Sequence, residues 1–228
     1  MEAGDPCPKC GMQLDRKGIH PQSCMAGGDA TLVHNGLRDV YEDYCKRGGM
    51  HPEHELGGLL SRDSRERPAD VLVIPSLALA RELPDGSRAV RTERVCFDFA
   101  VVNALGPDHW SATASGSGGA AEQFDQRKRR NNQTEAKCRQ AGLSFWPMVF
   151  EQQGGKSKAA DAATRAISEA VAEKEGRKAA TIRHELNNRV AILLARAAAA
   201  MIARRQAGPS RPEQSALAAA MAATQWLE

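Results

Sequence analysis

The chain has 228 residues, of which 42% are hydrophobic and only 4% aromatic, and its formal net charge is +3. This length and apolar content are sufficient for one folded domain of ordinary size with appendages. The small net charge excludes a nucleic-acid-binding mode that depends on overall positive charge, so an electrostatic argument for such binding must come from local clusters.

Three isolated cysteines and the lengths of the apolar segments indicate the cellular compartment of the protein. Cys45, Cys96 and Cys138 occur singly in different predicted elements, which favours free thiols in a reducing compartment over a disulfide framework. The N-terminus has no apolar run before a cleavage site, and no uninterrupted apolar stretch is long enough to span a bilayer. We therefore expect an intracellular protein without a membrane partner.

A group of potential metal ligands occurs near the N-terminus. Cys7 and Cys10 form a C-x-x-C pair, which brings two thiolates to one side of a tetrahedral ion, and His20 and Cys24 are spaced to close the other side. The alternative is a set of ordinary thiols in a ragged terminus, but segments so rich in cysteine seldom order themselves without a metal or a disulfide. The pattern predicts a structural Zn²⁺ site, a CCHC zinc knuckle, over residues 1–28.

The first long element is predicted to be a helix. Apolar residues recur at helical spacing over residues 29–46, with Asp29 or Thr31 as the N-cap. Gly48 and the glycine after it end the pattern.

The following segments are predicted to be strands. Residues 53–60 are expected to form a short strand or turn, and the β-branched residues 69–74 a strand buried on both faces. The Pro-Asp-Gly sequence at 84–86 predicts a hairpin between residues 78–83 and 89–102. The end of this hairpin is a candidate central strand.

The order of elements predicts the fold class. The small residues of 111–119 are typical of a flexible linker, and a polar helix over 120–140 and a strand over 143–151 follow. Together these elements predict an α/β (α+β) fold in which a small mixed sheet is flanked by helices. Sheets of this kind place acidic catalytic groups on adjacent central strands.

Two acidic motifs resemble those of a known nuclease family. Arg67, Pro68 and Asp70 form an R-P-x-D motif, and Asp98 supplies a second acid in the candidate central strand. With the preceding knuckle, they resemble the restriction-enzyme-like endonuclease, of the PD-(D/E)XK superfamily, at the C-terminal end of some non-LTR retrotransposon polyproteins. The resemblance covers about residues 7–155.

The chain also departs from the family pattern. Ala69 separates the proline from the acid, and Ala100 stands where the superfamily often has lysine. Lys128 matches the lysine of the family's K-x-x-x-Y element, although Asn132 replaces the tyrosine, so we expect Lys128 to supply the basic group. Downstream, the residues similar to the family's F-x-P-x-x-x-E-x-x-G stretch are Phe145, Pro147, Glu151 and Gly154.

The resemblance implies metal-dependent hydrolysis of DNA phosphodiesters. Asp70 and Asp98 would hold Mg²⁺ or Mn²⁺ through oxygen ligands, and such an ion activates water and neutralises charge at the phosphate. Lys128 would orient the water or stabilise the developing charge, and Glu151 and Glu55 would complete the metal shell. Taken alone, an aspartate at a strand end is more often a turn former or a salt-bridge partner than a catalytic residue.

Local basic clusters offer contacts to nucleic acid. Residues 127–130 are consecutively basic, which is typical of a solvated helix face, a nuclear-import signal or an edge that contacts phosphates. We expect a nuclear protein in which phosphates are contacted by Arg67, Arg127, Arg129 and Arg130. Histidines near predicted loops are more often surface residues than ligands, so the predicted site excludes His34, His51 and His54.

The C-terminal part is rich in alanine. Beyond the domain predicted over 29–155, residues 156–206 are expected to form a helical extension with helices over 157–175 and 178–206. The second helix has an apolar stripe for core packing, and its remaining surface carries Arg183, Arg189, Arg196, Arg204 and Arg205. Residues 207–228 are expected to be a weak helix or a disordered tail.

The sequence thus predicts a metal-dependent DNA endonuclease of retroelement origin with a structural zinc knuckle. An alternative is a catalytically inactive zinc-knuckle module that binds single-stranded DNA or RNA, because the usual lysine near Asp98 is missing. The low aromatic content weakens that alternative. A zinc-braced adaptor for protein interactions is a third reading, supported only by the Ala-rich helices.

Overall fold

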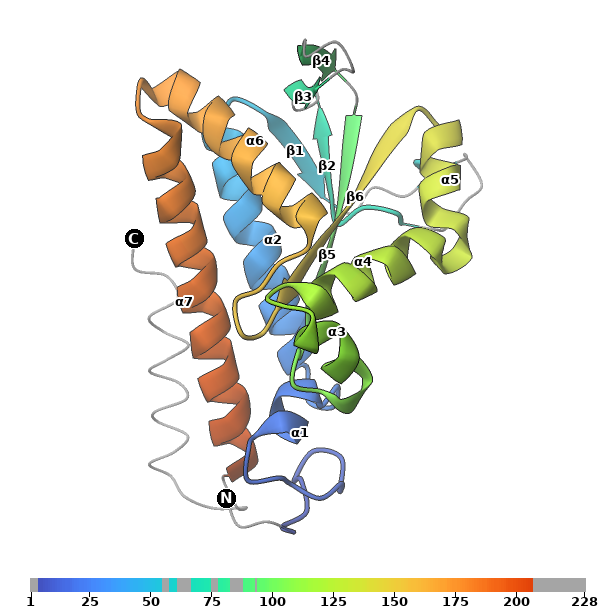
Figure 1. Ribbon diagram of the computed structural model, residues 1–228, viewed down its shortest axis with the longest axis vertical. Helices are drawn as coiled ribbons and strands as arrows, with labels where there is room; N and C mark the ends of the chain where they lie inside the picture. Colours follow the sequence, from blue (N-terminus) through green and yellow to red (C-terminus); the bar gives the residue numbers. More distant parts are fainter. Residues whose placement is uncertain are drawn as a thin grey trace.

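The computed structural model describes residues 4–54, 58–60, 67–74, 78–82, 88–92 and 94–206. A four-stranded mixed sheet runs through the centre of the molecule, with helices on both of its faces (Figure 1). This arrangement confirms the predicted α+β class. Residues 207–228 lie outside the described part of the chain, so the prediction for this tail remains a prediction.

The sheet has the strand order β1 (His51–His54), β2 (Val71–Ile74), β5 (Arg94–Val102) and β6 (Leu143–Glu151). The pairs β1–β2 and β2–β5 are antiparallel, whereas β5–β6 is parallel. The two central strands are therefore β2 and β5. β6 lies at an edge, a position that tolerates Pro147 because no further strand requires its missing N–H.

The predicted hairpin forms, but its second arm is divided. β3 (Ala78–Glu82) pairs with β4 (Arg88–Thr92) in a separate two-stranded sheet, and β5 begins only at Arg94. The prediction of one continuous strand over 89–102 was therefore wrong. Charged residues interrupt the apolar pattern between β4 and β5, and only β5 enters the main sheet.

One face of the sheet is covered by α2 (Asp29–Arg47), α6 (Lys158–Glu175) and α7 (Ala179–Gln206), as Figure 1 shows. Alternate residues of β5 point into this core, and the hydroxyl groups of Tyr41 and Thr164 are 2.6 Å apart within it. The apolar stripe predicted for α7 is confirmed, because its buried residues are Ile182, Leu186, Val190, Leu194 and Met201. The last two helices therefore complete the main core, and packing continues across residue 155.

The opposite face is covered by α4 (Gly119–Arg130) and α5 (Thr134–Gln140). The predicted single helix over 120–140 is interrupted by the short 3₁₀ turn η2 (Asn131–Gln133), in which Asn132 and Gln133 have positive φ angles of 48° and 56°. Asparagine tolerates this left-handed conformation better than most residues. The interruption turns α5 away from the axis of α4.

The segment expected to be a flexible linker is ordered. η1 (Pro107–His109) and α3 (Trp110–Ala114) precede a glycine-rich turn into α4. A Cβ atom at Gly119 would lie only 1.9 Å from the carbonyl oxygen of Ala112, so the two backbones are in direct contact. A Cβ atom at Gly118 would similarly lie 2.5 Å from the Lys156 carbonyl oxygen. Gly118 and Gly119 therefore permit close packing, which composition alone did not distinguish from flexibility.

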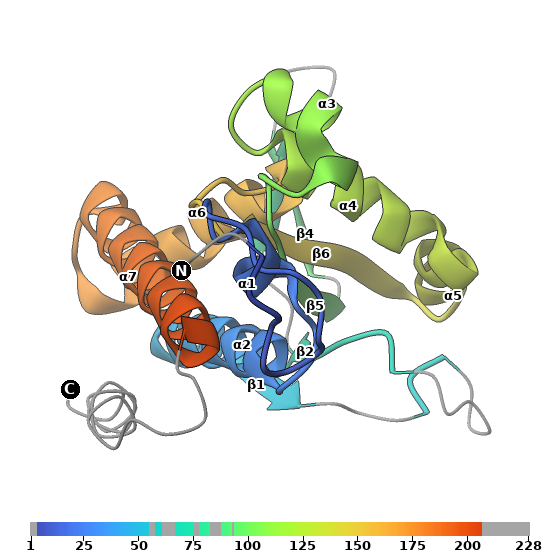
Figure 2. The same cartoon turned by 90° about the horizontal axis from the view of Figure 1, so that it is seen from below.

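The N-terminal segment packs against the rest of the fold. Figure 2 shows the short helix α1 (Ile19–Ser23) among α7, α2 and β5. The Asn103 side chain, just beyond β5, donates to the Ile19 carbonyl oxygen at 3.0 Å and to the Ser23 hydroxyl at 2.9 Å. This segment is thus fixed to the end of a central strand.

Arg205 secures the same segment from the end of α7. Its side chain is fully buried and donates to Asp29 at 2.6 Å and to the carbonyl oxygens of Cys24 and Ala26 at 3.3 and 3.0 Å. Arg205 was predicted to lie on the exposed surface of α7, and Asp29 or Thr31 was predicted to be the N-cap of α2. Both predictions were wrong, because Arg205 is buried, the N-cap is Gly28, and the Asp29 carboxylate pairs with arginines of α7.

Among the described helices, α7 is long and apolar enough to cross a membrane, by length and composition alone. This differs from the expectation that no segment would be long and apolar enough. Core helices of soluble proteins can share this property, and α7 packs its apolar stripe against α2 and α6.

Candidate functional site

The four predicted zinc ligands form a cluster. The ligand atoms of Cys7, Cys10, His20 and Cys24 all lie within 4.8 Å of one another, and the Cys10 sulfur is 3.3 Å from Nε2 of His20. A tetrahedral Zn²⁺ with bonds of about 2.3 Å to sulfur separates its ligands by roughly 3.8 Å. The Cys/His cluster, as we call these four residues, could therefore hold a metal such as zinc.

Local hydrogen bonds fold the chain around this cluster. The Cys7 N–H donates to the Met12 carbonyl at 2.7 Å, and the Gly11 N–H donates to the Cys7 carbonyl at 2.8 Å, which closes the turn between the first two cysteines. The Asp15 carboxylate then organises the start of α1 by accepting from the backbone N–H groups of Lys17, Ile19 and His20. Asp15 thus directs His20 toward the cysteines.

The electrostatics of Cys7 favour metal binding. Burial opposes ionisation of this thiol, but hydrogen bonds from the Lys9 backbone, the His20 side chain and Cys10 outweigh it and lower the pKa of Cys7 to about 6. The thiolate is the form that binds metals. Cys7 is therefore ready to ligate near neutral pH.

A second polar cluster contains the two predicted aspartates. Val71 of β2 is paired with Phe97 of β5, and extending this antiparallel register by one residue places Asp70 beside Asp98. The Asp70 N–H also donates to the Phe97 carbonyl at 2.8 Å. The two carboxylates therefore come from neighbouring positions on the two central strands.

Asp70 is held by two donors. Its Oδ2 atom is 2.9 Å from Nε2 of His34 and accepts a 2.6 Å hydrogen bond from the Phe99 N–H. Burial opposes the charge of Asp70, but the contact with His34 outweighs it and lowers the pKa of Asp70. The same hydrogen bond raises the pKa of His34.

Asp98 is paired with the lysine of α4. Lys128 Nζ lies 2.7 Å from Asp98 Oδ2 and donates to the Phe99 carbonyl at 3.2 Å. Burial raises the pKa of Asp98; Lys128 offsets this only in part, and the charge of Asp70 adds to it. Asp98 is thus a carboxylate whose negative charge is incompletely compensated. We refer to His34, Asp70, Asp98 and Lys128 as the acidic cluster.

The sequence-based site excluded His34, although the structure places it in the acidic cluster. His34 lies on α2, three residues before the buried Leu37 and seven before the buried Tyr41. An ionisable side chain on the core-facing stripe of a helix was a signal that could have identified it.

The acidic cluster offers the donors that a hard divalent cation prefers. Asp70 and Asp98 supply carboxylate oxygens, and their side chains are 22% and 27% exposed, so an ion can reach them. Within the described ranges, close convergence of three or more metal-binding side chains occurs only at the Cys/His cluster. At the acidic cluster, His34 and Lys128 instead contact one carboxylate each, at 2.9 and 2.7 Å. The carboxylate oxygens are donors of the type that Mg²⁺ prefers, but the four side chains are not gathered around one point as the Cys/His cluster is.

Glu151 has a different role from the predicted one. Its buried carboxylate accepts hydrogen bonds from the N–H groups of Gly118, Ala120 and Ala121 at 3.1, 2.9 and 3.2 Å. A Cβ atom at Gly155 would lie 2.0 Å from Glu151 Oε2, so the carboxylate fills a close-fitting space. Both oxygens cap the start of α4, the helix that carries Lys128. Glu55, the other predicted acid, lies outside the described residues.

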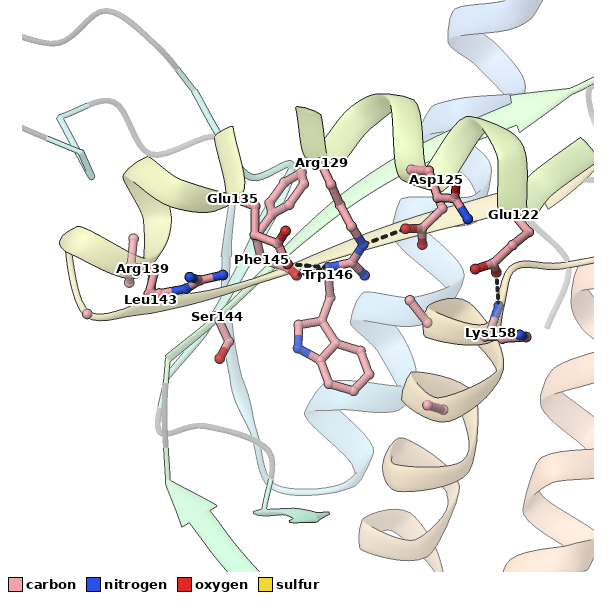
Figure 3. A pocket seen from close by; sticks show the side chains of 14 residues that line it. Glu122, Asp125, Arg129, Glu135, Arg139, Leu143, Ser144, Phe145, Trp146 and Lys158 are labelled. Carbon is pink, nitrogen blue, oxygen red and sulfur yellow. Dashed lines mark hydrogen bonds and ion pairs between the residues drawn. The ribbon is translucent and has the colours of Figure 1, made fainter. Parts of the chain in front are cut away.

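The predicted arginine contacts divide into two groups. Arg129 bridges Asp125 and Glu135 at 2.6 and 2.7 Å in a pocket of about 790 Å³ beside β6, where Figure 3 shows its side chain reaching across from α4. The guanidinium group of Arg129 is therefore already paired with two carboxylates. The arginines with exposed side chains are Arg67, Arg127 and Arg130.

Comparison with protein families and with curated proteins finds no match for the chain. The functional argument therefore rests on the geometry of the two clusters. One is a compact Cys/His group, and the other joins two central strands to α2 and α4.

Proposed function

We propose that the chain is a metal-dependent DNA endonuclease of retroelement origin that hydrolyses phosphodiester bonds. The observation that carries this proposal is the position of Asp70 and Asp98 on adjoining central strands, with Lys128 only 2.7 Å from the second carboxylate. Carboxylates beside a lysine are the groups that metal-assisted phosphodiester hydrolysis requires. The predicted resemblance to restriction-enzyme-like endonucleases agrees with this chemistry.

Each residue has a distinct part in the proposed reaction. Asp70 and Asp98 would hold Mg²⁺ or Mn²⁺, which when bound activates water and neutralises charge at the phosphate. The Phe99 N–H keeps the Asp70 carboxylate oriented through its 2.6 Å hydrogen bond. Lys128, whose Nζ lies 2.7 Å from Asp98, would donate to a phosphate oxygen, where negative charge grows during hydrolysis.

The two metal-binding clusters would divide structural and catalytic work. Zn²⁺ at the Cys/His cluster would fix the N-terminal segment, which Asn103 and Arg205 already attach to β5 and α7. Exposed Arg127 and Arg130 on α4 would contact the DNA backbone near Lys128. Such contacts hold DNA without reading its sequence.

Nicking of supercoiled plasmid tests the proposal. We expect the zinc-loaded chain to nick DNA in Mg²⁺ or Mn²⁺ but not in excess chelator, and we expect Asp70→Asn and Asp98→Asn to reduce the rate by about a hundredfold or more. The control is Asp108→Asn, an exposed carboxylate in η1, which should nick like the parent. Equal nicking by all three variants would remove the proposed site.

A second function is favoured by one feature of the acidic cluster. His34 and Lys128 already lie 2.9 and 2.7 Å from the carboxylates of Asp70 and Asp98, so both aspartates have side-chain partners, as expected for a nuclease-like scaffold that has lost activity. Such a protein would be a zinc-knuckle module that binds single-stranded DNA or RNA. Binding of oligonucleotides without any metal-dependent nicking would support this function over the first.

A further inference from the structure

The segment that follows β5 presents an exposed apolar surface. Trp110, the first residue of α3, is 60% exposed, and Leu105, just beyond the end of β5, is 41% exposed. The two residues are in direct contact, because the indole N–H of Trp110 donates to the Leu105 carbonyl oxygen at 2.8 Å. We refer to Trp110 and Leu105 as the platform.

Hydrogen bonds determine what the platform can contact. An indole ring has one polar hydrogen, and that of Trp110 is already used by Leu105. The exposed part of the ring therefore offers an apolar aromatic surface, which favours stacking against another flat ring. The Thr113 hydroxyl donates to the Ala104 carbonyl at 2.7 Å and so fixes α3 to the segment below the platform.

A row of α4 side chains leads away from the platform. Nδ1 of His109, the neighbour of Trp110, lies 2.8 Å from Oε1 of Gln123. Arg127 and Arg130 follow Gln123 at positions i+4 and i+7, so the three residues share one face of α4, and all three are exposed. Figure 2 shows α3 and the start of α4 side by side, on the side of the molecule away from α2. We refer to these three residues as the arginine face.

The arginine face combines positive charge with an aromatic ring. The guanidinium carbon of Arg127 lies 4.0 Å from the centroid of the Phe124 ring, and this contact orients the cation. Lys128, the next residue, turns inward and contacts Asp98 at 2.7 Å. Lys128 follows Gln123 by five residues, which is about 7.5 Å along the helix axis. A ligand that extends from the platform along the arginine face would therefore pass close to the acidic cluster.

We propose that the platform and the arginine face bind single-stranded DNA, with an unpaired base stacked on Trp110 and phosphates contacted by Arg127 and Arg130. This inference rests on the nucleic-acid binding of the proposed function and names its substrate class, DNA with an unpaired segment beside the cleaved bond. Bases inside a duplex are stacked on one another, whereas those of a single strand can stack on an aromatic side chain. The arginines beside the platform favour a polyanion over an apolar protein partner.

Fluorescence anisotropy of a labelled oligonucleotide tests this inference with the zinc-loaded full chain. We expect the parent to bind the single strand more tightly than the duplex of the same sequence. Trp110→Leu keeps an apolar side chain but removes the aromatic ring, so it should weaken single-strand binding by about tenfold and duplex binding by much less. Trp110→Phe should restore most of the affinity. The matched control is Ile192→Ala, a similarly exposed apolar residue (52%) on α7, which should bind like the parent.

The arginine face has its own test. Arg127→Gln should weaken the binding of both forms of DNA and reduce its salt dependence, because one phosphate contact is lost. Arg183→Gln, which removes an exposed arginine of α7 on the opposite face of the sheet, should change neither.

Three results would overturn the inference. They are single-strand binding that is unchanged in Trp110→Leu, a loss that Trp110→Phe does not restore, and tighter binding of the duplex by the parent. Self-association of the parent that disappears in Trp110→Leu at unchanged DNA affinity would assign the platform to a second copy of the chain instead. In each case, metal-dependent nicking that persists in Trp110→Leu and is lost in Asp98→Asn would leave the proposed endonuclease intact.

Discussion

The Cys/His cluster and the acidic cluster each consist of four side chains, but the chain brings these side chains together in different ways. At the first, four ligand atoms lie within 4.8 Å of one another along a short piece of chain. At the second, two carboxylates from adjoining strands are each paired with a side chain from a different helix. The first is closed by local turns, whereas the second is assembled by the whole fold.

This difference indicates which property of the protein each cluster should affect. A structural metal site fills all its positions with protein ligands, whereas a catalytic site keeps positions open for water and substrate. The Cys/His cluster has the closed form, whereas the acidic cluster is partly exposed. We therefore expect changes at the first to act mainly on stability and changes at the second mainly on metal binding and cleavage.

The largest expected effect is on stability, through the Cys/His cluster. We expect removal of Zn²⁺ by a chelator, or Cys7→Ser, to lower the free energy of unfolding by about 5 kcal/mol, because metal ligation and the packing of α1 are lost together. Thermal unfolding with and without chelator measures this. The chelator should have no further effect on Cys7→Ser, and equal stability of the two forms would show that the cluster carries no metal.

The next effect concerns the link between this cluster and α7. Arg205→Met should destabilise the fold by about 3–5 kcal/mol, because it leaves the buried Asp29 carboxylate without its main partner. Urea unfolding measures the loss. The neighbouring Arg204→Met is the control: Arg204 is 32% exposed and Asp29 keeps its pair with the buried Arg205, so this variant should lose less stability than Arg205→Met. Equal effects would contradict the central role of Arg205.

Substitution of Glu151 tests whether this residue stabilises the start of α4, the helix that carries Lys128, or binds the metal ion itself. Glu151→Gln should cost about 2–3 kcal/mol of stability, because three N–H groups at the start of α4 lose a charged acceptor. The affinity for Mn²⁺ should change little. Glu122→Gln, which affects a single bond to the Lys158 N–H, should cost less. Lost Mn²⁺ binding at unchanged stability would instead make Glu151 a ligand.

The smallest expected effect is the pH dependence of stability that comes from Asp98. Its pKa is raised in the folded state, mainly by burial, so the folded protein binds more protons than the unfolded chain between the ordinary pKa of aspartate and the raised value. In the metal-free acidic cluster, stability should therefore fall as pH rises through this window. Asp98→Asn should remove that slope, while Asp43→Asn at an exposed ion pair should keep it. A steeper slope in Asp98→Asn would contradict the stated cause.

The sequence predicted the features that depend on local pattern. The bounds of β6, the stripe of α7 and the Cys/His spacing follow from short-range periodicity, and the structure has them at the expected residues. It also predicted that acids would lie on adjacent central strands, although the register of Asp70 and Asp98 depends on strand pairing.

Other features depend on contacts between distant segments. His34 joins Asp70 from a different element, and Arg205 meets Asp29 from the far end of the chain, so neither partner is visible in a local pattern. Glu151 was taken for a metal ligand because sequence does not show that α4 begins beside it. The glycine-rich turn before α4 was taken for a linker because composition does not distinguish close packing from mobility.

Calorimetric titration of the zinc-loaded chain with Mn²⁺ tests the central claim most directly, namely that Asp70 and Asp98 share one divalent cation. We expect one ion to bind per chain in the parent. Binding should be lost in both Asp70→Asn and Asp98→Asn and retained in Asp108→Asn. Uptake that is unchanged in the first two variants, or no uptake by the parent, would contradict the account.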